Sequence, residues 1–244
     1  MASTSETGHA VNVANLNTMI SRLQGYGARY NPTNNSIKIP ALQTLYTNSN
    51  NSLTAVSTTK PAFDDAVNDR QEIFQAMEKL ATRIINAFDA TEAVTDKMVD
   101  DGKAIIRKIR GARASKKIIN PNPDEPQQIS ASQQSFTQQL EHFSKLIALV
   151  ASESTYNPNE NELKNAQLTA FKNQMVTLNN AAINATTPYL TAIQNRNNFL
   201  YTPKTGLVDI AQEVKKYVKS VSTITLAEFR QISGLKFTRP KKTQ

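Results

Sequence analysis

The chain of 244 residues has no cysteine, no tryptophan and only seven glycines. The absence of cysteine excludes disulfides, thiolate metal sites and cysteine catalysis. Asn, Thr, Gln and Ala are abundant, whereas the alternation of apolar and polar residues that is typical of strands is scarce. Together with the shortage of glycine, this composition favours an all-α fold.

Long apolar runs are missing as well. The longest candidate, residues 146–151, is far shorter than the roughly 18 residues that a membrane-spanning helix needs. The segment from Met1 to Gly8 is small and polar and has no apolar run behind it, unlike a secretory signal. We therefore expect a cytoplasmic protein without a membrane span. The net charge of +8 permits contact with nucleic acid or acidic lipid, but it does not bear on the fold.

What the chain does contain is an internal repeat. Tyr30-Asn31-Pro32 returns 126 residues later as Tyr156-Asn157-Pro158. Further pairs follow in order, with a change of register near Pro203: Ile37 with Leu163, Leu42 with Leu168, Phe63 with Tyr189, Arg70 with Arg196, Met77 with Leu207, and Ile84 with Val214. The sequence therefore predicts a first helical repeat with a polar N-terminal tail (residues 1–117), a Pro-rich linker (residues 118–135) and a second repeat with a basic C-terminal tail (residues 136–244).

Each repeat is predicted to begin with a short amphipathic helix. Its apolar stripe is formed by Val13, Leu16, Met19, Ile20 and Leu23 in the first repeat and by Leu140, Phe143, Leu146, Ile147 and Val150 in the second. The Tyr-Asn-Pro turn ends this helix. Asn159 followed by Glu162 resembles a capping box and predicts the start of the next helix.

A long helix is predicted to follow in each repeat. Its apolar residues in the first repeat recur in steps of three and four, averaging about 3.5, which is the coiled-coil period: Leu42, Leu45, Leu53, Val56, Phe63, Val67, Phe74, Met77, Ala81, Ile84 and Phe88. Such a seam needs a partner helix to cover it. We therefore expect the long helices of the two repeats to pack together in an elongated helical bundle with pseudo-two-fold symmetry.

Prolines and glycines predict the breaks. Pro61 and Pro188 are expected to kink or divide the long helix, and Thr202 before Pro203 predicts a new helix start in the second repeat. The final short helix is expected to end at Gly111 or Gly234. In the second repeat, Thr225 and Glu228 predict its capping box.

Arg70 and Arg196 are the most informative polar pair, because both fall on the apolar seam. One hypothesis is a paired anion site on the pseudo-two-fold axis. The preferred interpretation is a register pin, in which each guanidinium snorkels to the surface or is held by a carboxylate such as Asp69 or Glu72. The Tyr-Asn-Pro motif is likewise interpreted as turn chemistry in preference to a recognition loop.

Two basic segments, residues 103–117 and 230–242, are candidates for contact with nucleic acid or with an acidic protein surface. Phe237 adds one stacking surface to the second segment. The candidate contact residues are Arg107, Arg113, Lys116, Lys117, Arg230, Lys236, Arg239, Lys241 and Lys242.

Groups that could support catalysis are sparse. His9 lies in the polar N-terminal tail and His142 stands alone, so neither a histidine triad nor metal-ligand spacing is present. The adjacent pairs Asp64-Asp65 and Asp100-Asp101 point apart on a helix, and no glycine-rich phosphate loop occurs. The sequence therefore predicts no enzyme, no cofactor, no metal and no small-molecule substrate.

Several segments resemble an uncharacterised family of tandem-duplicated helical proteins from Bacteroidota. They are Gly8-His9-Ala10, Asn12-Val13-Ala14-Asn15, Gly25-Tyr26-Gly27, Thr205-Gly206-Leu207-Val208-Asp209, and the end from Gln231 to Lys241. The resemblance covers the whole chain. It implies a bacterial, cytoplasmic origin and no mechanism.

Two functional hypotheses follow. The first is a non-enzymatic structural or assembly protein that acts through protein–protein contacts, including self-assembly. The alternative is a nucleic-acid-binding protein that uses the two basic segments, with an affinity that falls steeply with salt.

Overall fold

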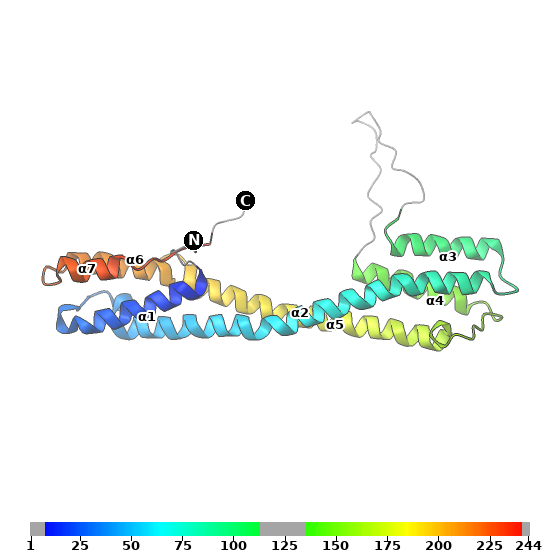
Figure 1. The fold of residues 1–244 in the computed structure, drawn as a ribbon, viewed down its shortest axis with the longest axis horizontal. Coiled ribbons are helices and arrows are strands. Elements are labelled where there is room, and N and C mark those ends of the chain that lie inside the picture. The colour runs from blue at the N-terminus through cyan, green and yellow to red at the C-terminus, as the bar shows by residue number, and fades with distance from the viewer. Residues whose placement is uncertain (1–7, 113–134, 241–244) are drawn as a thin grey trace, which may run out of the picture. The chain divides into compact units, whose positions relative to one another are not determined.

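The computed structural model describes residues 8–112 and 135–240, and within them the fold is all-α, as predicted. The described residues form seven α-helices, three short 3-10 turns and no strand (Figure 1). The helices are α1 (His9–Gly25), α2 (Ile39–Asp89), α3 (Asp96–Ile109), α4 (Phe136–Ala151), α5 (Asn165–Tyr201), α6 (Leu207–Ser220) and α7 (Leu226–Ser233), and the 3-10 turns are η1 (Gly27–Arg29), η2 (Asn35–Ile37) and η3 (Asn161–Leu163).

The chain divides into two compact units. Unit 1 consists of Met1–Phe63 and Ala185–Gln244, and unit 2 of Asp64–Asn184. The predicted repeats, residues 1–117 and 136–244, do not coincide with these packing units. Each unit combines parts of both repeats because the long helices α2 and α5 contribute one end to each unit. All but the last residue of the predicted linker, residues 118–135, lies outside the described residues, and that last residue, Ser135, is the N-cap of α4.

The core of unit 1 is built on α1. All five predicted stripe residues of this helix are buried, together with side chains from α2, α5, α6 and α7. The buried residues from these other helices include Leu42, Leu200, Leu207, Val214 and Ile232. The predicted amphipathic helix is therefore confirmed for the first repeat.

The core of unit 2 is built on α4 in the same way. Four of its five predicted stripe residues are buried, and the fifth, Leu140, packs against the same cluster while partly exposed. The other elements supply Met77, Ile84 and Phe88 from α2, Ile109 from α3, and Leu168 and Met175 from α5.

Pro61 and Pro188 were predicted to kink or divide the long helices, and the division is wrong. α2 is continuous through Pro61, and α5 is continuous through Pro188. A proline inside a helix removes one backbone hydrogen bond, but buried residues anchor each helix on both sides of it, such as Leu42 and Met77 in α2. The seam of α2 is buried at Leu42 and from Phe74 to Phe88, and only half-buried in between.

Two predicted helix starts are also wrong. The 3-10 turn η3 occupies the place of the expected first turn after Asn159, so α5 begins at Asn165. α6 begins at Leu207 with Gly206 as its N-cap, because Lys204 takes a left-handed conformation (φ 68°) that a helix starting at Pro203 could not contain. The predicted capping box of Thr225 and Glu228 is confirmed at the start of α7.

The two helix ends differ. Gly111 has φ 65° and follows the last turn of α3, where the amide of Ala112 donates to the carbonyl of Arg107. This is the left-handed helix end that glycine favours, as predicted. Gly234, by contrast, is the C-cap of α7 with φ −69°, so its end needs no left-handed residue.

The Tyr-Asn-Pro turn is built alike in both units. The hydroxyl of Tyr30 donates to the carbonyl of Ile37 at 2.6 Å, and the hydroxyl of Tyr156 donates to the carbonyl of Leu163 at 3.0 Å. All four residues are buried. Each tyrosine therefore closes its own turn and places the 3-10 residue that precedes the long helix.

Candidate interaction surfaces

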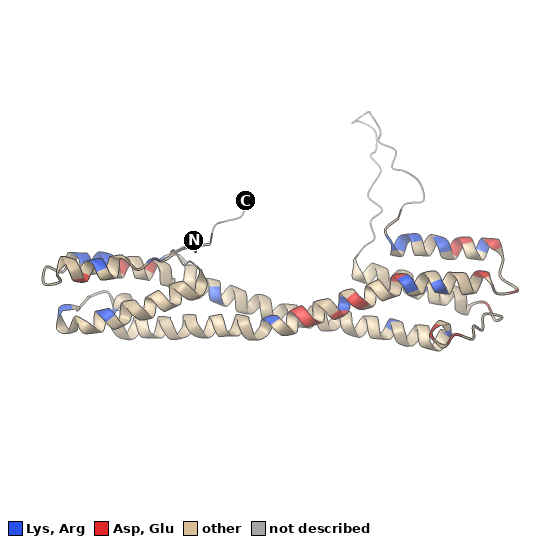
Figure 2. Cartoon of the chain, in the orientation of Figure 1, with Lys and Arg blue, Asp and Glu red and all other residues tan. Residues whose placement is uncertain are grey.

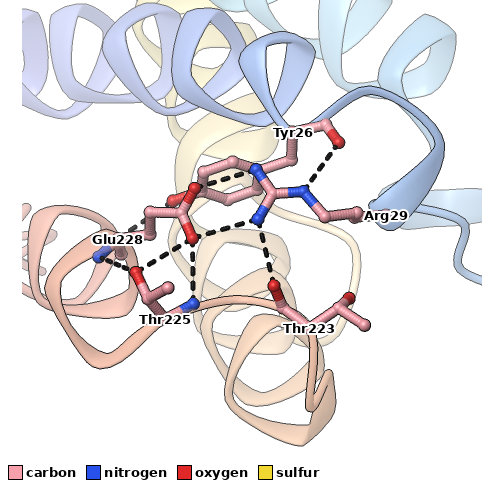
Figure 3. A network of polar contacts seen from close by, with 5 residues as sticks. All are labelled: Tyr26, Arg29, Thr223, Thr225 and Glu228. Carbon is pink, nitrogen blue, oxygen red and sulfur yellow. Dashed lines mark hydrogen bonds and ion pairs between the residues drawn. The ribbon is translucent and has the colours of Figure 1, made fainter.

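A polar network in unit 1 joins η1 to the start of α7 (Figure 3). The guanidinium of Arg29 donates to both carboxylate oxygens of Glu228, at 3.1 and 2.8 Å, and to the carbonyl of Thr223 at 3.0 Å. The Tyr26 hydroxyl donates to the Glu228 carbonyl. The hydrogen bonds from Arg29 and from the Thr225 amide lower the pKa of Glu228 to about 2. Each carboxylate oxygen of Glu228 accepts a hydrogen bond from Arg29, so the network connects η1 to α7 and is not a ligand-binding site.

The C-terminal tail docks on unit 1. Asn12 exchanges two hydrogen bonds with the backbone of Thr238, at 2.8 and 3.0 Å, and Asn15 donates to the carbonyl of Lys236 at 2.7 Å. Arg239 pairs with Asp209 at 2.7 Å and donates to the carbonyl of Tyr201. Arg239 was predicted to contact a partner, but its guanidinium binds the Asp209 carboxylate and the Tyr201 carbonyl of the same chain.

Arg70 and Arg196 belong to different units and have different partners. The guanidinium carbon of Arg70 lies 4.2 Å from the centroid of the Phe136 ring. Arg196 donates to the side chain of its neighbour Asn197, and its charge contributes to lowering the pKa of His9. Neither arginine forms an ion pair with the described residues. The sequence did not identify Phe136 as the partner, because it starts a helix more than sixty residues away.

The two histidines are placed differently from each other. His9, assigned to the tail from sequence, is the first residue of α1, and its Nδ1 lies 2.7 Å from the Tyr201 hydroxyl. His142 is 4 % exposed, and neither ring nitrogen has a hydrogen-bond partner within the described part of the chain. Burial, followed by the charges of Lys145 and Lys108, lowers the pKa of His142. Burial and the lowered pKa both favour the neutral form of the His142 ring.

The remaining predicted cations divide into two groups. Arg107, Arg230 and Lys236 are exposed. Arg113, Lys116, Lys117, Lys241 and Lys242 lie outside the described residues. Lys103 and Arg110, which flank Arg107 on α3, are exposed too.

The surface of α5 is notable for its lack of charge. Lys172 and Arg196 are its only charged residues, and residues 173–195 contain none. Figure 2 shows this helix almost entirely without acidic or basic positions, whereas α3 carries both along its length. Depletion of charge is the compositional mark of the core of a protein–protein interface.

Exposed apolar side chains recur on this uncharged helix. Val176 and Ile183, in unit 2, are 40 % and 54 % exposed, and Leu190, in unit 1, is 54 % exposed. They follow one another at intervals of seven, which places them on one stripe of a helix. The exposed residues Asn180 and Thr187 lie between them. We name these five residues the α5 stripe. The sequence did not predict the α5 stripe, because apolar residues at this spacing were expected to be buried against a partner helix.

Comparison with known proteins adds no relationship: no family model, no curated protein and no solved structure matches the chain. The resemblance to the Bacteroidota family therefore stays a prediction, as does the cytoplasmic location. In residues 8–112 and 135–240, no helix combines the length and apolar character needed to span a bilayer. No cluster of three or more potential metal ligands occurs in the same residues.

Proposed function

We propose that this protein is a non-enzymatic assembly protein that associates with copies of itself through the α5 stripe. The observation that carries the proposal is the combination of Val176, Ile183 and Leu190, exposed at heptad spacing, on a helix segment without charge. Contiguous exposed apolar surface rimmed by polar residues is typical of protein contact sites.

A second copy of the chain is the occupant that the charges favour. Two chains of net charge +8 repel each other, so they approach most easily where charge is absent. The α5 stripe offers such a surface and presents a seven-residue repeat that is complementary to itself. An acidic partner, by contrast, would find no cation along residues 173–195 to bind.

The size of the apolar surface sets the expected strength. Complete burial of a Val, Ile or Leu side chain contributes about 1.5–3 kcal/mol, so covering the exposed part of each contributes about 1 kcal/mol. Three residues from each of two copies then contribute roughly 6 kcal/mol, against an association cost of similar or greater size. We therefore expect weak self-association that requires high protein concentration.

The test is the oligomeric state of the full chain by sedimentation velocity over a range of concentrations. The unaltered chain should associate reversibly, and Ile183→Lys should weaken association at least tenfold, because it places a charge at the centre of the contact. Association should change little with salt.

Asn195→Lys is the matched control. It adds the same charge to the same helix at an exposed position about 100° around the helix from the α5 stripe. It should associate like the unaltered chain. A chain that stays monomeric at the highest concentration, or equal effects of the two variants, would contradict the proposal.

The tandem duplication is part of the same proposal. Support comes from the identical tyrosine hydrogen bonds of the two turns and from the burial of the paired residues Leu42 and Leu168. The rings of Phe63 and Tyr189, which the repeat makes equivalent, also stack with centroids 4.8 Å apart. Contact between equivalent residues is what a two-fold relationship requires.

A further inference from the structure

A groove in unit 2 gathers three cations around one cavity. The cavity lies between α2 and α3, has a volume of about 250 Å³, and is lined by Thr82, Ile85, Lys103, Ile106, Arg107 and Arg110. The cations come from α3 at steps of four and three residues, and this spacing puts them on one face of the helix. We call this the α2–α3 groove.

Close packing of the two helices forms the base of the groove. Gly102 lets α3 approach α2, since a Cβ at this position would lie 2.3 Å from Cδ1 of Ile85. Ile85 and Ile106 are buried there. The apolar base offers no aromatic ring, so the groove has no surface on which a nucleobase could stack.

Arg110 is held in place by α2. Its Nη2 donates to the hydroxyl of Thr82, and this hydroxyl in turn donates to the carbonyl of Glu78. The hydroxyl hydrogen of Thr82 is thus in use within the helix. Thr82 positions the guanidinium of Arg110 and is not itself a donor to a ligand.

No carboxylate of the described residues forms an ion pair with a cation of the groove. Lys103, Arg107 and Arg110 form no ion pair there, and the neighbouring Arg83 is already paired with Glu162 at 2.6 Å. The C-terminal end of α3 presents a dipole equivalent to roughly half a negative charge, which offsets only part of three positive charges. A bound anion would supply the rest.

In unit 1, a basic side chain beside a helix end has hydrogen-bond partners within the protein. Lys215 of α6 donates to the carbonyls of Ser233 and Leu235 at the end of α7, and its Nζ lies 5.3 Å from the centroid of the Phe237 ring. Protein atoms there surround the ammonium group. Of the three cations of the α2–α3 groove, only Arg110 donates a side-chain hydrogen bond to a protein group among the described residues, the Thr82 hydroxyl.

We propose that the α2–α3 groove binds a phosphate group. Guanidinium groups match phosphate oxygens in paired hydrogen bonds, and the ammonium group of Lys103 adds a point charge. The volume of about 250 Å³ lies below the range of pockets for larger organic ligands, so the groove takes the phosphate and leaves the rest of the ligand outside. The phosphate can come from a free phosphate compound or from a nucleic-acid backbone.

Titration of the full chain with inorganic phosphate, followed by amide NMR shifts at constant ionic strength, tests the proposal. Saturable shifts are expected at residues 103–110 and at Thr82. Arg107→Gln should raise the dissociation constant at least tenfold. Lys97→Gln, the control, removes one exposed cation of the same helix away from the groove and should change the constant less than twofold.

A second arm adds a single-stranded DNA oligonucleotide. Tighter binding than inorganic phosphate, displaced by phosphate and falling steeply with salt, identifies the backbone as the source. Binding of phosphate alone identifies a free phosphate compound. Absence of saturable shifts, equal weakening by the two variants, or binding of polyglutamate that phosphate does not displace would overturn the proposal. Unchanged helical circular dichroism of both variants establishes that they fold.

Discussion

At the scale of single residues, Glu228 serves three contacts at once. Its carboxylate accepts hydrogen bonds from Arg29, from the Thr225 amide and from the Thr225 hydroxyl. These partners are the reason that its pKa falls from 4.5 to about 2. Since the folded state binds the proton more weakly than the unfolded state, stability from Glu228 is complete above pH 4.5 and is lost as pH falls toward 2.

Glu228→Gln should therefore reduce the urea midpoint at neutral pH and flatten its decline between pH 4.5 and 2. Urea unfolding at a series of pH values measures both effects. Glu72→Gln, which changes an exposed carboxylate of α2, should alter neither. A decline in Glu228→Gln as steep as in the unaltered chain would show that other carboxylates govern acid stability.

Single residues also show what sequence reasoning reaches. The stripe of α1 and the capping box of Thr225 and Glu228 are local patterns, so spacing alone identifies them. The partners of Arg29 and Arg70 are Glu228 and Phe136, which the chain brings close only on folding. No local spacing encodes such contacts. The cations of the α2–α3 groove belong to the predicted basic segment 103–117, but the cavity that they surround forms only on folding. The α5 stripe differs from a buried seam in its exposure and not in its spacing, so the spacing alone did not predict it.

At the scale of elements, the break between α5 and α6 depends on one glycine. A Cβ on Gly206 would lie 2.6 Å from the amide nitrogen and 2.8 Å from the carbonyl oxygen of Thr202. These are backbone atoms of the same turn and cannot move aside cheaply. The sequence predicted a break at this place but not its form, because Pro203 suggested a helix start and the left-handed Lys204 was not anticipated.

Gly206→Ala should lower the free energy of unfolding by about 1–3 kcal/mol, the usual cost of forcing extra atoms into a packed site. Gly25→Ala is the control, since nothing lies within 4 Å of a Cβ at the end of α1. It should leave stability unchanged or raise it by up to about 1 kcal/mol, because alanine favours helix. Equal urea midpoints for the two variants would contradict the role assigned to Gly206.

At the scale of the whole molecule, the two units are interleaved along the chain. A fragment of residues 1–117 holds α1, α2 and α3, and a fragment of residues 118–244 holds α4 to α7, so each contains only part of both cores. The prediction of two repeats rests on matched residues that recur in order. Packing between the long helices of the two repeats was predicted too, but the division of each long helix between two compact units was not, because the matched residues do not show where one core ends and the other begins.

Separately expressed fragments 1–117 and 118–244 should therefore be poorly folded alone and should recover helical content and cooperative unfolding when mixed. Circular dichroism and co-purification through a tag on one fragment measure this recovery. Cooperative unfolding of either fragment as a monomer would contradict the interleaved arrangement.

The same arrangement has a consequence for biosynthesis. Unit 2 is one continuous stretch, so its core can close while the ribosome is still translating the remainder of the chain. Met1–Phe63 is translated before unit 2, but its packing partner Ala185–Gln244 is translated after unit 2. The first segment of unit 1 is thus translated well before the segment that completes its core. The apolar stripe of α1 stays uncovered in that interval, so α1 is a segment that a chaperone can bind.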